Sequence, residues 1–245
     1  MTRDKSIYDE RKDRILGIVV NEYIQTVTPV SSGYIAKRYI RDLSPATIRN
    51  ILAELEERGF LTHPHTSAGR VPTQDGYRYY VDNLMSEIQL LEGEKVRIKN
   101  EYEQERRDLE ELMEKTSEVI SDLTHYTSII SVDGLNGKIF CKGTSYVVSY
   151  PETQDVEKIR NILRTLEEKE RILHIINRGL RERIKIYIGH EITLREMESC
   201  ALAVSSYELN DGHRGRIAVL GPTRMDYQRV VSALDYITAM LNKIF

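Results

Sequence analysis

The side chains best suited to recognition chemistry fall between Ser44 and Asn50, where hydroxyl, guanidinium and amide groups follow one another closely. Arg49 and Asn50 carry paired hydrogen-bonding groups that match the edges of guanine and adenine in the major groove of DNA. Ala46 and Ala53 are small, so a helix that carries them could approach base pairs closely. These residue types predict a surface that reads a DNA sequence.

These residues need a helix to present them, and the sequence marks both ends of one. Ser44 can cap the first free N–H groups, Pro45 fits the first turn, and Gly59 can adopt the left-handed conformation that ends a helix. Apolar residues at helical spacing predict the side that faces a core, namely Ile48, Ile51, Leu52 and Leu55. The opposite side is small and polar.

Two further helices and a hairpin complete the expected N-terminal unit. The helices are expected over residues 9–26 and 31–40. One strand of the hairpin is expected at Phe60–Thr62 and the other at Arg70–Pro72, with a turn at Thr66–Gly69. This order is typical of a winged helix-turn-helix DNA-binding domain, which we expect over residues 1–82.

In a winged arrangement the hairpin loop can contact phosphates or enter the minor groove. The candidate DNA-contacting residues are Ser44, Ala46, Thr47, Arg49, Asn50, Ala53, His65, Thr66, Ser67 and Arg70. His63 and His65 do not indicate a metal site, because no cysteine or further histidine nearby completes a zinc pattern. The alternative for the whole segment is a three-helix bundle that serves for docking or dimerisation.

A helix-like pattern with a heptad repeat links the two ends of the chain. Its apolar seam predicts one continuous helix from Leu84 to Leu123, within a linker segment over residues 83–125. Two alternatives stay open: the seam pairs with a second copy of the chain, or it packs on the later domain of its own chain.

The last segment, residues 126–245, is predicted to be an α+β domain with an antiparallel sheet and helices to one side. Strands are expected at Thr127–Val132, Lys138–Lys142, Tyr146–Tyr150, Ile184–Ile188, Ala201–Glu208 and Arg216–Leu220. Helices are expected at Asp155–Asn177 and Asp226–Ile244.

Two short motifs could suggest catalysis, but neither is complete. Gly143-Thr144-Ser145 and Gly189-His190-Glu191 do not supply a base, an orienting group and an oxyanion donor together. Gly221-Pro222-Thr223 lacks the glycine and lysine spacing of a phosphate-binding loop. We therefore expect no enzyme activity, no cofactor and no metal.

Composition bounds the other function classes. The net charge of −3 argues against indiscriminate coating of nucleic acid, although cations gather locally at Lys37, Arg38, Arg41, Arg49, Arg70 and Arg78. The two cysteines are too few for a disulfide framework. No signal sequence or apolar run of membrane length is present, so a cytoplasmic protein is expected.

Several of these segments resemble the HrcA family of bacterial heat-inducible transcription repressors. The matching segments are Leu43–Asn50, Pro64–Thr73, Gly76–Asp82 and Gly221–Tyr227, with weaker support at Gly143–Ser145 and Pro151–Glu170. The resemblance implies a cytoplasmic homodimer that binds the inverted repeat called CIRCE ahead of chaperone operons and shuts off their transcription. It also implies that the chaperonin GroEL keeps the repressor active, and that the C-terminal domain has a GAF-like fold.

The chain departs from the family pattern in two places. Ile51 stands where the family tends to have an acidic residue. The middle is short between Ser131 and Gly143, where longer members carry further strands and a helical insertion, so the GAF-like domain is reduced. Two hypotheses follow: a DNA-binding repressor, or a ligand-sensing or protein-interaction module that retains the winged fold without binding an operator.

Overall fold

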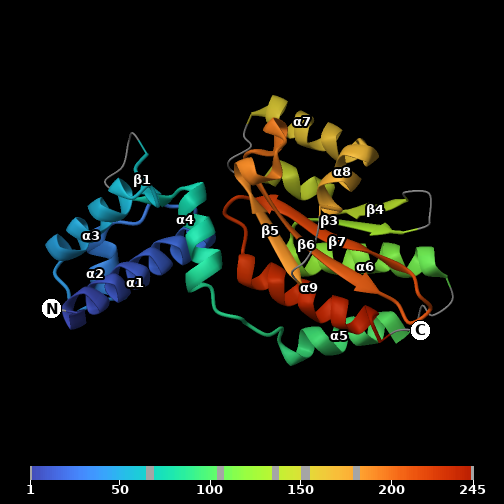
Figure 1. Ribbon diagram of the computed structural model, residues 1–245, viewed down its shortest axis with the longest axis horizontal. Coiled ribbons are helices and arrows are strands. Elements are labelled where there is room, and N and C mark those ends of the chain that lie inside the picture. The colour runs from blue at the N-terminus through green and yellow to red at the C-terminus, as the bar shows by residue number, and fades with distance from the viewer. Residues whose placement is uncertain are drawn as a thin grey trace. The chain divides into compact units, whose positions relative to one another are not determined.

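The chain folds into two compact units, Met1–Ser86 and Glu87–Phe245, which are described separately. The computed structural model describes residues 2–64, 69–103, 108–133, 138–149, 155–178 and 183–243. Figure 1 shows helices and a short hairpin in the first unit, and a sheet with helices in the second. The chain is therefore of the α+β class, as predicted.

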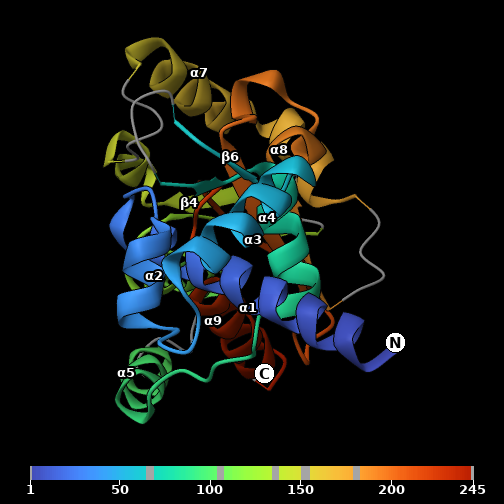
Figure 2. The same ribbon diagram turned by 90° about the vertical axis from the view of Figure 1, so that its left-hand side faces the viewer.

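The N-terminal unit is built from helices around a short antiparallel hairpin. Its elements are α1 Thr2–Thr26, α2 Ser32–Arg38, α3 Pro45–Glu57, β1 Leu61–Thr62, β2 Val71–Pro72, α4 Gln74–Tyr79 and a π-helical turn at Tyr80–Leu84. Figure 2 turns α1 to α4 toward the viewer. The three predicted helices and the predicted hairpin are therefore present.

Apolar side chains at helical spacing hold this unit together. The buried set includes Ile15, Leu16, Val19, Ile35, Ile48, Leu52, Leu55 and Tyr80. Polar tips of two tyrosines find partners on α1, since the Tyr79 hydroxyl donates to Asp13 at 2.9 Å and the Tyr80 hydroxyl donates to Asn21 at 2.8 Å. These bonds let the bulky rings be buried without leaving an unsatisfied hydroxyl.

The C-terminal unit contains a five-stranded antiparallel sheet in the order β4-β3-β7-β6-β5. Its strands are β3 Thr127–Val132, β4 Ile139–Lys142, β5 Ile184–Ile188, β6 Cys200–Glu208 and β7 Arg214–Pro222. Its α-helices are α5 Glu92–Glu103, α6 Leu109–Thr124, α7 Val156–Glu167, α8 Lys169–Ile176 and α9 Tyr227–Leu241. The long central strands β6 and β7 are buried almost throughout, as a covered sheet requires.

Helices cover both faces of this sheet, so the prediction of helices on one side is wrong (Figure 1). On one face, α7 and α8 place Ile162, Ile172 and Ile176 against Leu202 and Leu220 of the sheet. On the other face, α6 and α9 contact the strands through hydroxyl groups: Ser117 Oγ donates to the carbonyl of Ser128, and Ser205 Oγ lies 3.2 Å from Thr238 Oγ1. The alternation of side chains along a strand explains why Leu202 faces one layer of helices and Ser205 the other, because neighbouring residues of a strand point to opposite faces.

The prediction of one continuous helix from Leu84 to Leu123 is also wrong. Residues 85–91 are not helical, and α5 and α6 are separate helices that contact each other. The Tyr102 hydroxyl donates to Thr116 Oγ1 at 2.7 Å, whereas a straight helix would hold these positions about 21 Å apart. Ile98, Tyr102 and Leu112, three residues of the predicted heptad seam, are buried inside their own unit, in agreement with the intramolecular alternative.

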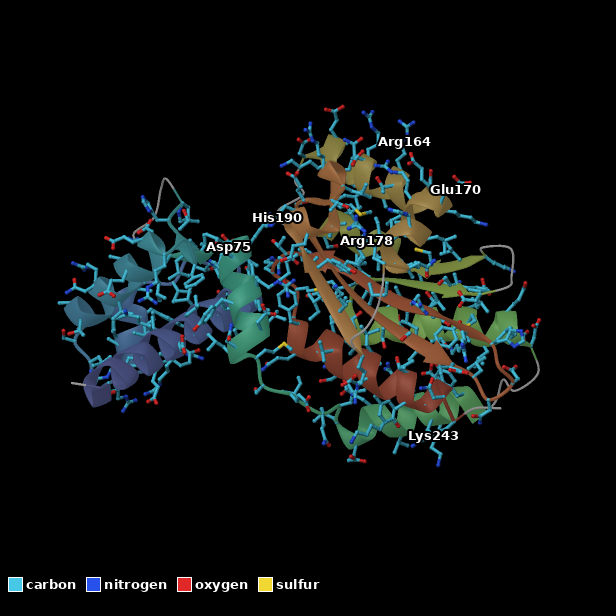
Figure 3. All side chains as sticks on the ribbon, viewed as in Figure 1. Asp75, Arg164, Glu170, Arg178, His190 and Lys243 are labelled. Atoms are coloured by element: carbon cyan, nitrogen blue, oxygen red, sulfur yellow. The ribbon has the colours of Figure 1, made fainter. Side chains whose placement is uncertain are left out.

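Two smaller differences from the prediction concern the segment before α7 and the helices α7 and α8 themselves. Thr144–Ser149 forms a 3-10 helix in place of the predicted strand Tyr146–Tyr150, whose last residue lies outside the described residues. The helix predicted over Asp155–Asn177 is two helices, since Glu168 leaves helical geometry between α7 and α8. Arg164 and Glu170 project from the exposed sides of these two helices (Figure 3).

Candidate nucleic-acid interface

Helix α3 begins and ends as its sequence signals predict. Ser44 Oγ accepts a hydrogen bond from the Thr47 N–H at 3.1 Å, and Pro45 occupies the first turn. After the helix, Gly59 has φ +81°, a left-handed conformation that costs glycine little. The apolar side, formed by Ile48, Ile51, Leu52 and Leu55, is fully buried.

The opposite side of α3 is exposed. Ala46, Thr47, Arg49 and Asn50 are exposed, and Ala53 is half-buried. Within the described part of the chain, the Arg49 and Asn50 side chains make no hydrogen bond or ion pair. Their donors and acceptors are therefore available to a ligand that lies along the helix.

An open groove of about 730 Å³ runs between α2 and the start of α3. Its lining includes two cations and one acid, Lys37, Arg41 and Asp42, together with the capping residue Ser44. All three charged residues are exposed. A groove with this lining beside the N-terminus of a helix suits a phosphate group, because both the cations and the positive end of the helix dipole attract anions.

The two strands of the hairpin pair in antiparallel fashion next to this helix. Leu61 pairs with Pro72 and Thr62 with Val71, and a further bridge joins Val30 to Arg70 through two backbone hydrogen bonds of 2.9 Å. Three chain segments therefore meet at the base of the loop. The predicted contact residues His65, Thr66 and Ser67 lie outside the described residues.

Arg70 makes an ion pair that the sequence did not indicate. Its Nη2 lies 2.8 Å from Oε2 of Glu56 on α3, and its side chain is 21% exposed. The other carboxylate oxygen of Glu56 accepts a hydrogen bond from Nδ1 of His63. The His63 hydrogen bond and the charge of Arg70 hold the pKa of Glu56 below its usual value, although partial burial acts in the opposite direction.

A second polar cluster, also missed from the sequence, joins α1 to α2. Glu22 accepts hydrogen bonds from the hydroxyls of Tyr39 and Tyr34, the latter at 2.8 Å. The Arg38 guanidinium lies 5.9 Å from the centre of each tyrosine ring. The Tyr39 hydrogen bond is the main cause that lowers the pKa of Glu22, and Tyr34 and Arg38 act in the same direction. The spacing of these residues gives no sequence signal, because the contact joins two helices.

Two of the motifs considered for catalysis lie in a 3-10 helix and in a turn. Ser145 lies in the 3-10 helix that follows β4, and Glu191 accepts a hydrogen bond from the Ile188 N–H at 2.9 Å at the turn after β5. His190 is exposed at that turn (Figure 3). Among the described residues, no cluster of histidine, cysteine or acidic residues could hold a metal ion, and no helix is long and apolar enough to cross a membrane.

Comparison with known proteins gives matches over nearly the whole chain. Residues 91–231 match the family model described as the HrcA protein C-terminal domain. The heat-inducible transcription repressor HrcA of Carboxydothermus hydrogenoformans is 30% identical, with 96% of this chain and 98% of the relative covered. The repressor of the same name from Symbiobacterium thermophilum is 28% identical, with 96% and 98% covered.

The alignments also bear on the length of the chain. They extend over 334 and 335 positions, while this chain has 245 residues, so a sizeable part of each relative has no counterpart here. Among solved structures, one described as a hypothetical protein at 2.2 Å resolution matches with a TM-score of 0.75. It is 20% identical and each chain is 96% covered, so it shows a shared fold.

Proposed function

The chain belongs to the HrcA family, and we propose that it represses heat-shock genes by binding an inverted repeat of the CIRCE type as a homodimer. Family membership supports the coarser part of this statement, a transcriptional repressor of heat shock. The relatives are repressors, which indicates a non-enzyme, and repression by occupying an operator requires binding alone.

One observation carries the DNA contact: α3 is capped, packed on one side and exposed on the other. In the proposed complex the N-terminal unit is a winged helix-turn-helix domain and α3 lies in the major groove. Arg49 and Asn50 contact base edges there, and Ala46 and Ala53 permit the close approach. Ser44 and Thr47 contact the DNA at the start of the helix.

The groove and the hairpin supply the contacts that position the helix. Lys37 and Arg41 bind backbone phosphates from the groove beside α3. The proposed loop contacts are His65, Thr66, Ser67 and Arg70. Because the net charge is negative, at −3, and the cationic patch is small, one copy should bind DNA weakly. Two copies related by a twofold axis would match the symmetry of an inverted repeat and double the patch.

We assign control of repression to the C-terminal unit. In this proposal it has a reduced GAF-like fold and joins two subunits, and the chaperonin GroEL maintains its active form. Heat would draw the chaperonin to unfolded proteins and so release the operator. One rival function is a protein-interaction or ligand-sensing module without operator binding. It is supported by the length of this chain, which lacks part of the length of its relatives.

A gel-shift titration separates the two functions. Wild-type protein, Asn50→Ala and Arg49→Ala are titrated against a chaperone-operon inverted repeat and a scrambled duplex of equal length, at several salt concentrations. We expect wild-type preference for the repeat and a loss of about 5- to 150-fold for each variant, since a paired contact to one base contributes roughly 1–3 kcal/mol. The scrambled duplex should be less affected.

The matched control is Lys169→Ala, which removes one exposed positive charge from the C-terminal unit. It should retain the preference for the repeat, and thermal unfolding should show that all variants are folded. Equal weak binding of wild-type protein to both duplexes would support the interaction module and reject operator recognition.

A further inference from the structure

A single carboxylate connects recognition helix α3 to both ends of the hairpin loop. Glu56 lies on the last turn of α3, His63 follows β1, and Arg70 precedes β2. Glu56 Oε1 accepts from His63 Nδ1, and Glu56 Oε2 lies 2.8 Å from Arg70 Nη2. We call these three side chains the loop clamp.

The loop clamp acts where the backbone is already fixed. Val30 and Arg70 exchange two backbone hydrogen bonds of 2.9 Å, and Gly69 packs tightly against Pro29. The base of the loop therefore has a defined position, and the clamp adds a side-chain link from that base to α3. A change at Glu56 should break this link and weaken, without abolishing, the backbone pairing of Val30 with Arg70.

The charge of Glu56 is unfavourable at this place by itself. A carboxylate repels the phosphates of any DNA bound by α3, and it sits at the helix end whose dipole favours positive groups. Glu56 is only 26% exposed, so its charge is less screened than that of a fully solvated side chain. Its pairing with His63 and Arg70 compensates for both effects.

We propose that Glu56 is a positioning residue for DNA binding: it orients Arg70 and His63 so that these two side chains meet the DNA backbone in register with α3. A guanidinium has five N–H donors, so an Arg70 held by Glu56 through one nitrogen retains donors for a phosphate. This inference rests on the proposed operator binding. It adds that an acidic residue strengthens binding to a polyanion.

The sign of the effect gives a sharp test. Operator affinity is measured for wild-type protein, Glu56→Ala and Glu57→Ala, the last as the matched control. Glu57 is the next residue on α3, is exposed, and has no ion pair or hydrogen bond within the described part of the chain. Loss of its negative charge should leave affinity unchanged or raise it slightly. Glu56→Ala should instead lower operator affinity about tenfold, as loss of one charge-assisted hydrogen bond does.

A double-mutant cycle and the salt dependence extend the test. Arg70→Ala should also weaken binding, and Glu56→Ala should have little further effect in the Arg70→Ala background, because both remove the same link. Glu56→Ala should reduce the dependence of log affinity on log salt by part of one phosphate contact. Glu56→Gln, which keeps an acceptor oxygen, should restore part of the affinity.

The possible failures are distinguishable. If wild-type protein prefers the repeat while Glu56→Ala binds as well as Glu57→Ala, the positioning role is wrong and operator recognition stands. If wild-type protein does not prefer the repeat, the proposed function fails first. In the protein without DNA, amide exchange at Val30 and Arg70 should be faster in Glu56→Ala than in Glu57→Ala, and equal exchange would reject the clamp.

Discussion

The Tyr102 hydroxyl donates to Thr116 Oγ1 at 2.7 Å inside the C-terminal unit, and Thr116 Oγ1 in turn donates to the Leu112 carbonyl at 2.7 Å. This chain of bonds joins α5 to α6, and both side chains are almost completely buried. Burial raises the pKa of the Tyr102 hydroxyl well above its usual value, because the interior disfavours the phenolate. Tyr102 therefore stays protonated in the folded unit to a higher pH than in the unfolded chain.

We predict that Tyr102→Phe destabilises the C-terminal unit by about 1 kcal/mol, the usual contribution of one hydrogen bond. Wild-type stability should fall as pH rises above about 10, the ordinary tyrosine value, since the unfolded chain releases its proton before the folded chain does. The variant should show a smaller fall, and Tyr207, whose pKa burial also raises, accounts for a remaining part. Denaturant unfolding between pH 8 and 11 measures both effects, and identical pH profiles would contradict them.

The features predicted from sequence are those fixed by local chemistry. Ser44, Pro45 and Gly59 identify α3 because capping and positive φ depend on neighbours only a few residues away. The same holds for β3 and β5, whose observed bounds coincide with the prediction. The exposed residues of α3 followed from its apolar spacing.

The features that were missed depend on contacts between distant segments. A heptad seam is compatible with one long helix and with two helices that fold against each other. The contact between Tyr102 and Thr116 distinguishes the two, and it is visible only in the folded structure. The two-sided covering of the sheet likewise depends on where α7 and α8 return. In the candidate site, nothing in the sequence indicated the contacts of Glu56, because its partners His63 and Arg70 come from the hairpin.

A second prediction concerns the cap of α3. Ser44→Ala removes the acceptor for the Thr47 N–H and should destabilise the N-terminal unit by about 1 kcal/mol. Ser44→Asp retains an acceptor at the same place and should keep most of the stability. Differential scanning calorimetry of the three proteins checks this order, and an alanine variant as stable as wild type would show that the cap contributes nothing.

A third prediction concerns the thiol of Cys141. Burial raises the pKa of this thiol to about 11, so its reactive thiolate is scarce at neutral pH. Alkylation by iodoacetamide at pH 8 should be slower than that of a free cysteine by about two orders of magnitude. The same reaction in guanidinium chloride should modify Cys141 and Cys200 quickly. Rapid uptake of one equivalent by the folded protein would contradict the burial of this side chain.

The last prediction tests how closely the hairpin packs on the turn between α1 and α2. A methyl group on Gly69 would lie 2.6 Å from the Pro29 carbonyl carbon and 2.7 Å from its oxygen, so Gly69→Ala must displace backbone. We expect a loss of about 1–3 kcal/mol, the usual cost of overpacking. Gly17→Ala in α1 is the matched control, because nothing lies within 4 Å of its added carbon, and it should stabilise the helix by roughly 0.5–1 kcal/mol. Thermal unfolding of both variants should therefore give shifts of opposite sign, and a neutral Gly69→Ala would mean that the hairpin base can move away from Pro29 at little cost.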